Sequence, residues 1–170
     1  DGARVVLVDL PGTALEESAV AVERAGGAAY IVHADVTRAT DVRAYVAEAE
    51  RQTGGIDHFF NNAGILGPVT SMFDYPEEVF DQVMNVNVKG VWLGMREVAK
   101  AMLRRGGGSI VNTASVAGLG GTPTLFAYGA SKHAVIGMTK SSALALGARN
   151  VRVNAVCPAV IETAMGEELA

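Results

Sequence analysis

The sequence predicts an α/β fold, a doubly wound parallel sheet with helices on both faces, in a single domain spanning residues 1–170. Short β-branched runs alternate with longer helical patterns along the chain, and this alternation is typical of βαβ units. The length of 170 residues suits one domain, and apolar residues make up 49% of it, enough to fill a core. No repeat, linker or shift in composition marks a domain boundary.

The first half of the chain contains three expected strands and two expected helices. The strands are expected at 4–10, 28–36 and 56–64, where β-branched and aromatic residues gather as they do in buried parallel strands. The helices are expected at 12–27 and 40–55.

Short sequence signals place the ends of these two helices. Thr13 and Glu16 have the spacing of a capping box, and Gly26 supplies the stop of the first helix. Thr40 is expected to cap the second helix, which ends at a pair of glycines.

The second half is expected to contain two long helices and two strands: helix 76–105, strand 109–115, helix 127–149 and strand 151–158. Pro76 suits the first position of a helix, and two glutamates follow it in the first turn. Gly90 lies in a β-branched stretch in the middle of this helix, where we expect a bend or a break.

Composition excludes several kinds of function. The net charge is −4 and charged residues make up 19%, so there is no electrostatic reason to expect nucleic acid or an anionic membrane as a partner. The apolar runs are too short to span a bilayer, and no secretory leader opens the chain. Cys157 is the only cysteine, so no internal disulfide can form and a reducing cytoplasm is expected.

No metal site is expected either. The three histidines, His33, His58 and His133, lack the spacing of metal ligands.

The expected strands end in short polar or small residues, and ligands of open parallel sheets bind outside these carboxyl ends. The five ends are marked by Asp9, Asp35, the turn "NNAG" at 61–64, Ser115 and Pro158. Taken one at a time, each of the first three also fits an ordinary turn.

Asp9 carries information about a possible nucleotide. Its carboxylate can accept two hydrogen bonds from a ribose diol, as the acidic residue of dinucleotide sites does. The same charge would repel a 2′-phosphate, and the following residue, Leu10, offers no compensating cation. If the site exists, it therefore favours NAD over NADP.

Tyr128 and Lys132 are spaced to share one face of a helix. A free tyrosine has a pKa of about 10, and a nearby ammonium lowers it by stabilising the phenolate, so such a pair can exchange a proton with an alcohol or a ketone. Small residues between them leave space beside the ring, and Ser115 could hold a substrate oxygen nearby. The alternatives are an ordinary exposed helix, and a serine that caps local backbone.

Five motifs in this order resemble those of the classical short-chain dehydrogenase/reductase family. They are "NNAG" (61–64), "NVNVKG" (85–90), "SVAG" (115–118), "YGASK" (128–132) and "VNAVCPAVIET" (153–163). The thirteen positions from Ser115 to Tyr128 are the usual interval of that family. The resemblance runs nearly end to end and implies a Rossmann-like sheet.

The resemblance also implies a catalytic set. Tyr128 would be the general acid/base, and Lys132 would lower its pKa and hydrogen-bond the nicotinamide ribose. Ser115 would orient the substrate oxygen. Asn87 would hold a water of the proton relay, although it also fits a residue that kinks a helix.

The cofactor implied by the resemblance is NAD, and NADP is disfavoured by Asp9. The cofactor-binding residues would be Asp9 at the adenine ribose, Asp35 and Val36 at the adenine, Asn61, Ala63 and Gly64 with Tyr128 and Lys132 at the nicotinamide ribose, and Pro158, Ile161 and Thr163 at the nicotinamide.

The chain departs from the family pattern in two respects. The first strand with its glycine-rich turn, T-G-x-x-x-G-x-G, is missing, as are the last strand and much of the substrate-covering segment after Met165. We therefore expect these residues to be the interior of a longer protein, lacking a central strand between its first and third strands, and to bind NAD weakly or not at all alone. Ala159 also stands where the family usually has glycine.

The sequence thus predicts an oxidoreductase that transfers a hydride between NAD(H) and a secondary alcohol or ketone. Its helices 76–105 and 127–149 resemble the family's interface, so a homodimer or homotetramer is expected. The alternatives are a non-catalytic dinucleotide-binding or interaction protein on this fold, and an inactive fragment. Sugar, steroid, cyclic alcohol and acyl-thioester substrates all fit the sequence.

Overall fold

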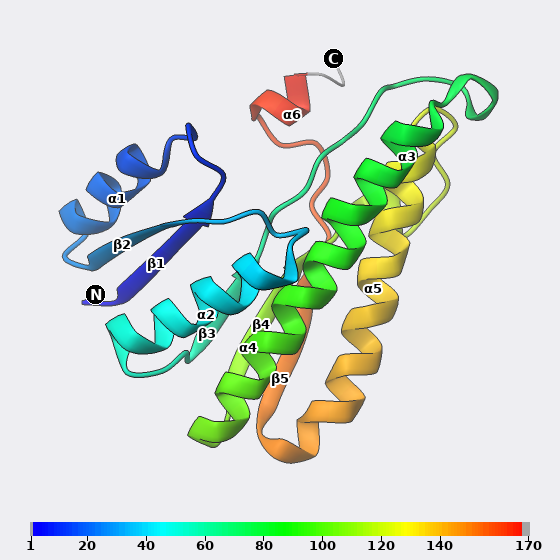
Figure 1. The fold of residues 1–170 in the computed structure, drawn as a ribbon. Helices are drawn as coiled ribbons and strands as arrows, with labels where there is room; N and C mark the ends of the chain where they lie inside the picture. Colours follow the sequence, from blue (N-terminus) through cyan, green and yellow to red (C-terminus); the bar gives the residue numbers. More distant parts are fainter. Residues whose placement is uncertain (1, 168–170) are drawn as a thin grey trace.

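The computed structural model describes residues 2–167 and confirms the predicted α/β class (Figure 1). All hydrogen-bonded strand pairs are parallel. The strands are β1 (Arg4–Asp9), β2 (Ala28–His33), β3 (His58–Asn61), β4 (Gly108–Thr113) and β5 (Val151–Val156). Each lies within a predicted strand or overlaps it closely, and β3 is the most shortened because the chain leaves the sheet at Asn61.

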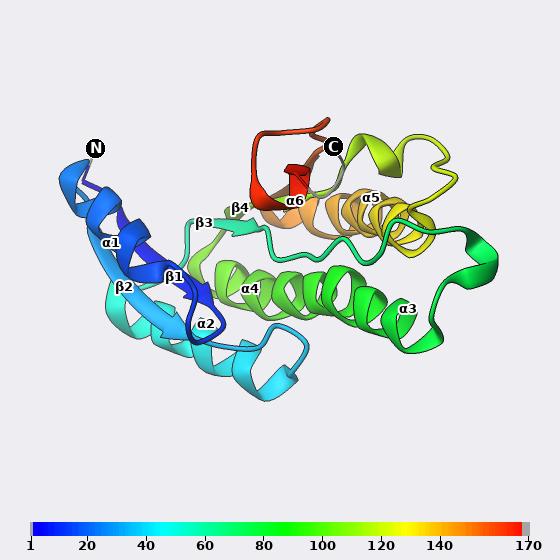
Figure 2. The ribbon, with the colours of Figure 1, turned by 90° about the horizontal axis from the view of Figure 1, so that it is seen from above.

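The helices alternate with the strands as predicted. They are α1 (Leu15–Arg24), α2 (Ala39–Thr53), α3 (Glu77–Met84), α4 (Val91–Arg105), α5 (Phe126–Leu146) and α6 (Ala164–Glu167). In Figure 2, α1 and α2 lie on opposite faces of the β1–β2 ribbon. The helix expected at 76–105 consists of α3 and α4 joined by a π-helical segment, η2 (Asn85–Gly90).

The expected break near Gly90 is this π-helical segment, and Gly90 at its end lies against another loop. A Cβ added at Gly90 would lie 2.9 Å from Cγ2 of Val36, in the loop after β2. Only a glycine lets that loop approach the helix so closely. π-Helical turns of this kind often lie at functional sites.

The five strands form two sheets rather than one continuous sheet. Their orders are β1-β2 and β3-β4-β5, and β1 does not pair with β3 within residues 2–167. This arrangement fits the expectation that a strand lying between them in the family is outside these 170 residues. The expectation of a single sheet is corrected to that extent.

A shared apolar core joins the two sheets. Helix α2 contributes Val42 and Tyr45, α4 contributes Val98 and Met102, and the partly buried Val8 of β1 packs against the same cluster as Ile110 of β4. Each fully buried side chain of this size is worth about 1.5–3 kcal/mol. Because α2 contacts β1, β2 and α4, it carries the packing from one sheet to the other.

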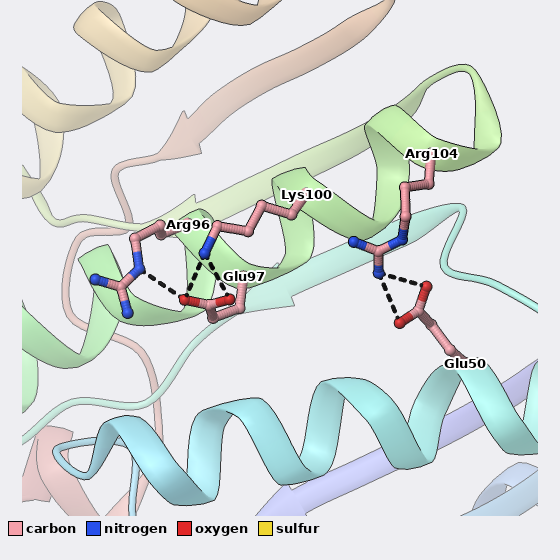
Figure 3. A network of polar contacts seen from close by, with 5 residues as sticks. All are labelled: Glu50, Arg96, Glu97, Lys100 and Arg104. Carbon is pink, nitrogen blue, oxygen red and sulfur yellow. Dashed lines mark hydrogen bonds and ion pairs between the residues drawn. The ribbon is translucent and has the colours of Figure 1, made fainter.

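Charged side chains at the junction of α2 and α4 add a smaller contribution (Figure 3). Arg104 of α4 donates to both carboxylate oxygens of Glu50 on α2, at 2.8 and 2.9 Å. Burial raises the pKa of Glu97, but hydrogen bonds from Lys100 and Arg96 outweigh it, so that the pKa lies below its ordinary value. Exposed pairs such as that of Arg104 are worth about 0–1 kcal/mol, so the apolar core dominates this junction.

The two predicted helix caps at Thr13 and Thr40 are wrong. Helix α1 begins at Leu15 with no side-chain cap, and the Thr13 hydroxyl donates to the carbonyl of Leu10 instead. The Thr40 hydroxyl donates to Asp41 inside α2. Thr13 lies one residue too early to cap α1, and Thr40 already lies inside its helix.

Gly118 and Gly137 provide a matched pair of stability predictions. A Cβ at Gly118 would lie 2.7 Å from the backbone oxygen of Lys132, whereas at Gly137, inside α5, it would meet no atom within 4 Å. We expect Gly118→Ala to lower the free energy of unfolding by about 1–3 kcal/mol through overpacking. Gly137→Ala should raise it by about 0.5–1 kcal/mol through helix propensity.

Urea denaturation followed by circular dichroism measures both changes. Equal effects of the two substitutions would contradict the close packing of Gly118 against α5.

Candidate active site

Ser115 lies two residues after β4 and is the N-cap of a short 3-10 turn, η3 (Val116–Gly118). Its hydroxyl oxygen accepts a hydrogen bond from the backbone N–H of Ala117 at 3.2 Å. The N–H of Val116 donates to the carbonyl of Pro158, which holds the chain after β5 beside the chain after β4. The hydroxyl hydrogen of Ser115 has no acceptor among residues 2–167 and remains available to a ligand.

Tyr128, in the first turn of α5, lines the same cavity as Ser115. The cavity has a volume of about 410 Å³. Three further predicted site residues, Pro158, Ile161 and Thr163, lie on its wall. The sequence predicts that Ser115, Tyr128 and these three residues belong to one site, and the structure brings the five together.

Lys132 lies one helical turn beyond Tyr128, below the surface, with only 3% of the residue exposed. Its Nζ donates to the carbonyl of Thr113 at 2.8 Å and lies 5.3 Å from the centroid of the Tyr128 ring. Burial lowers the pKa of this amine to about 8. A cation near neutral pH thus lies beside the tyrosine, as the spacing predicted.

Asn87 is fully buried in the π-helical segment and clamps the chain after β3. Its Oδ1 accepts from the N–H of Ile65, and its Nδ2 donates to the carbonyl of the same residue, both at 2.8 Å. Nδ2 also donates to Ser131 at 3.0 Å, and the Ser131 hydroxyl donates to the carbonyl of Tyr128 at 2.7 Å. Both amide hydrogens are used, so a water at Asn87 would have to be bound through an oxygen, and the relay water remains a prediction.

Gly64 brings the turn after β3 into the same site. A Cβ added there would lie 3.3 Å from Oδ1 of Asn87 and 3.5 Å from Nζ of Lys132. The backbone of Gly64 therefore passes beside the Lys132 amine, and no side chain of this residue occupies the space next to the amine. Ala63 precedes it on the exposed side of the turn.

The side chain of Asn61 points into the core. Its Nδ2 donates to the carbonyl of Val91 at 2.9 Å and to Oδ1 of Asn112 at 3.1 Å. Asn112 in turn donates to Thr139 of α5 at 3.0 Å. This side chain thus ties β3 to β4 and α4, and the predicted contact with a nicotinamide ribose would have to come from its backbone.

The other predicted nucleotide contacts lie at the ends of β1 and β2. Asp9 is exposed, and its Oδ1 accepts from the N–H of Leu10 at 2.7 Å, while Oδ2 has no partner in the part of the chain described. Oδ1 of Asp35 accepts from both the N–H and the hydroxyl of Thr37, so this oxygen serves a local turn. Val36 packs against Gly90.

These groups fit the ribose portions of a dinucleotide. The Asp9 carboxylate has an oxygen free to accept from a diol, the Lys132 amine has donors left, and Gly64 gives close access to backbone.

Within residues 2–167, no three His, Cys, Asp or Glu side chains group to hold a metal ion. No helix in this part of the chain has the length and apolarity to cross a membrane.

The sequence pattern does not identify several residues of the site. Ile65 and Thr113 act through backbone atoms and leave no signal in the sequence. Ser131 is one of the small residues between Tyr128 and Lys132, and it lies three residues after Tyr128, where a side chain can bond back to the helix. Asn112 offered a signal, because an amide inside the apolar run "SIVNTAS" must find partners when it is buried.

Comparison with known proteins places the chain in a family. The family model for short chain dehydrogenase matches residues 1–170. Levodione reductase from Leifsonia aquatica is 40% identical over 169 residues, which cover 98% of this chain and 63% of that protein. The chain therefore belongs to the short chain dehydrogenase family, and it spans less than two thirds of the length of this relative.

Two solved structures show the same fold with different cofactors. NAD⁺-bound xylitol dehydrogenase has a TM-score of 0.95 and 38% identity, over 98% of this chain and 64% of that one. An actinorhodin polyketide ketoreductase with NADPH has a TM-score of 0.93 and 34% identity, over 98% and 64%. The fold therefore does not decide between the two nicotinamide cofactors.

The buried amine of Lys132 gives a prediction about pH. Its pKa falls from 10.5 to about 8 on folding, so the unfolded chain holds this proton more tightly than the folded protein does. Below about pH 8 the folded protein bears the full cost of the buried charge, and this cost is relieved as the pH rises towards 10.5. We expect the free energy of unfolding, relative to Lys132→Met, to increase by about 3 kcal/mol over this interval.

Urea denaturation from roughly pH 7 to 11 tests this expectation, with Tyr128→Phe present in both proteins, because titrating groups that do not contact Lys132 cancel in the difference. A difference that stays level or decreases with pH would show that the amine is not buried as described.

Proposed function

We propose that the protein is an NAD-dependent oxidoreductase that interconverts a secondary alcohol and a ketone. The carrying observation is that Ser115 and Tyr128 lie on the wall of one cavity, with the buried amine of Lys132 5.3 Å from the tyrosine ring. Membership of the short chain dehydrogenase family supports the reaction class.

In this proposal the protein moves a proton at the substrate oxygen. In the direction of reduction, Tyr128 gives its phenolic proton to the ketone oxygen, and the hydroxyl of Ser115 donates a hydrogen bond to the same oxygen. The Lys132 ammonium stabilises the phenolate that results, since opposite charges attract strongly in a partly buried site. The nicotinamide, when bound, supplies or accepts the hydride at the substrate carbon.

The cofactor proposed is NAD rather than NADP. The exposed carboxylate of Asp9 has a free oxygen for a ribose diol and would repel a 2′-phosphate. The other proposed contacts are Asp35 and Val36 for the adenine, Asn61, Ala63, Gly64 and Lys132 for the nicotinamide ribose, and Pro158, Ile161 and Thr163 for the nicotinamide. The clamp of Asn87 on Ile65 would position the turn that carries Gly64.

We also propose a homodimer or homotetramer formed through α4 and α5. Trp92 on α4 is 45% exposed, and the guanidinium of Arg96 lies 4.5 Å from its ring centroid. Leu144 on α5 is also exposed. Large apolar side chains on a helix surface favour burial against another copy.

The single cysteine, Cys157, fits a reducing cytoplasm.

Substitution of the tyrosine tests the reaction. Tyr128→Phe should lower kcat/KM for secondary alcohols by about a thousandfold, because the acid/base is removed while the ring is kept. Ser115→Ala should cost about a hundredfold through loss of the hydrogen bond to oxygen. The assay follows NADH absorbance over a panel of alcohols, with the longest natural chain that contains these residues.

Tyr30→Phe, in β2 and outside the cavity, is the matched control and should keep full activity. Equal activity of Tyr128→Phe and the unchanged protein would remove the mechanism. Absence of turnover in the unchanged protein, with NAD still bound, would favour the non-catalytic alternative.

Substitutions at the end of β1 test whether the protein prefers NAD to NADP. The double substitution Asp9→Ser with Leu10→Arg removes the repelling carboxylate and adds a cation for a 2′-phosphate. We expect the ratio of kcat/KM for NADP to that for NAD to rise by about tenfold to hundredfold. Asp74→Ser, in a distant 3-10 turn, controls for the loss of one negative charge. A ratio unchanged by the double substitution would show that Asp9 does not contact the ribose.

A further inference from the structure

The wall of the cavity also points to the kind of substrate. We propose that the cavity takes an uncharged, mainly hydrocarbon secondary alcohol or ketone and rejects substrates that carry a carboxylate, sulfonate or phosphate. This inference rests on the proposed function, since it names the substrate class of the same site.

Most of the described wall is apolar. Leu66 comes from the chain after β3, Val116 from η3, Leu125 from the start of α5, and Val160 and Met165 from the segment after β5. Four separate segments of the chain thus contribute apolar side chains to one cavity of about 410 Å³. This volume lies within the range of about 300–1,000 Å³ that small-molecule pockets have.

No charged group faces the cavity from the residues described. Its lining contains no Asp, Glu, Lys, Arg or His. The cation Lys132 does not line the cavity, because it is 3% exposed and donates to the carbonyl of Thr113. An anionic substrate group buried against this wall would lose its hydration without gaining a partner, which disfavours its binding.

The other hydroxyl groups of the wall already donate hydrogen bonds within the protein, and that of Thr113 donates to Oδ1 of Asn62 at 2.9 Å. The hydroxyl of Thr122 donates to the carbonyl of Leu125 at 3.3 Å. The hydroxyl of Thr163 donates to the carbonyl of Ile161 at 3.3 Å and accepts from Gly166 at 3.2 Å. Ser115 and Tyr128 are therefore the polar side chains left for a ligand, enough for a single substrate oxygen.

Three ketones that share a ring test the proposal: 4-methylcyclohexanone, 4-(hydroxymethyl)cyclohexanone and 4-oxocyclohexanecarboxylate. Reduction is followed by the loss of NADH absorbance. The protein used is the longest natural chain that contains these residues. We expect kcat/KM to be at least about a hundredfold higher for the methyl ketone than for the carboxylate, with the hydroxymethyl ketone between them. Comparable kcat/KM for the methyl ketone and the carboxylate would overturn the proposal.

A charge introduced into the wall provides a second test. Val116→Lys places an ammonium at the cavity and should raise the ratio of kcat/KM for the carboxylate to that for the methyl ketone by at least about tenfold. Val20→Lys is the matched control, because Val20 is 44% exposed on α1 and does not line the cavity. The same change of ratio in both variants would overturn the proposal, since it would reflect long-range charge alone.

Ligand-observed NMR separates failure of the substrate class from failure of the reaction. We expect saturation transfer from the protein to the methyl ketone and none to the carboxylate. Binding of the methyl ketone without turnover would support the substrate class and overturn the proposed function. Turnover of all three ketones at similar rates, dependent on Tyr128, would support the function and overturn the substrate class.

Discussion

The hydrogen bond from the Lys132 amine to the Thr113 carbonyl is the interaction on which the geometry of the site depends. It joins α5 to the end of β4 through a buried charge, and burial lowers the pKa of the amine to about 8. An unpartnered amine at this depth would be far more costly. Because Ser115 follows the same strand and Tyr128 belongs to the same helix, this bond brings their hydroxyl groups to one cavity.

A second set of hydrogen bonds aligns the chain after β3 with this pair. Asn87 holds both backbone groups of Ile65 and reaches α5 through Ser131, which bonds back to Tyr128. Asn87 is buried within the π-helical segment, and Gly64 passes beside Asn87 and Lys132. The ends of β3 and β4 thus meet α5 at one place through the buried side chains of Asn87 and Lys132 rather than through surface ion pairs.

The division into two sheets separates the roles proposed for the site. The groups proposed for the proton step lie just after β4 and on α5, whereas Asp9 ends β1 and Asp35 lies two residues after β2, in the other sheet. The two parts are joined by the core between α2 and α4 and by the contact of Val36 with Gly90. The apolar packing at that junction therefore sets the distance between the proposed adenine and nicotinamide contacts.

The sequence by itself determined the order of strands and helices and the pairing of Tyr128 with Lys132. Both follow from local periodicity, since apolar runs mark strands and residues four apart share a helical face. Only the tertiary structure decided that Asn61 faces the core, that Thr13 caps nothing, and that Ile65 and Thr113 serve the site through their backbones. Backbone groups are the same in every residue, and the direction of a side chain at a strand end depends on what packs against it. Local patterns therefore identified the reactive side chains, and long-range packing determined how they are held.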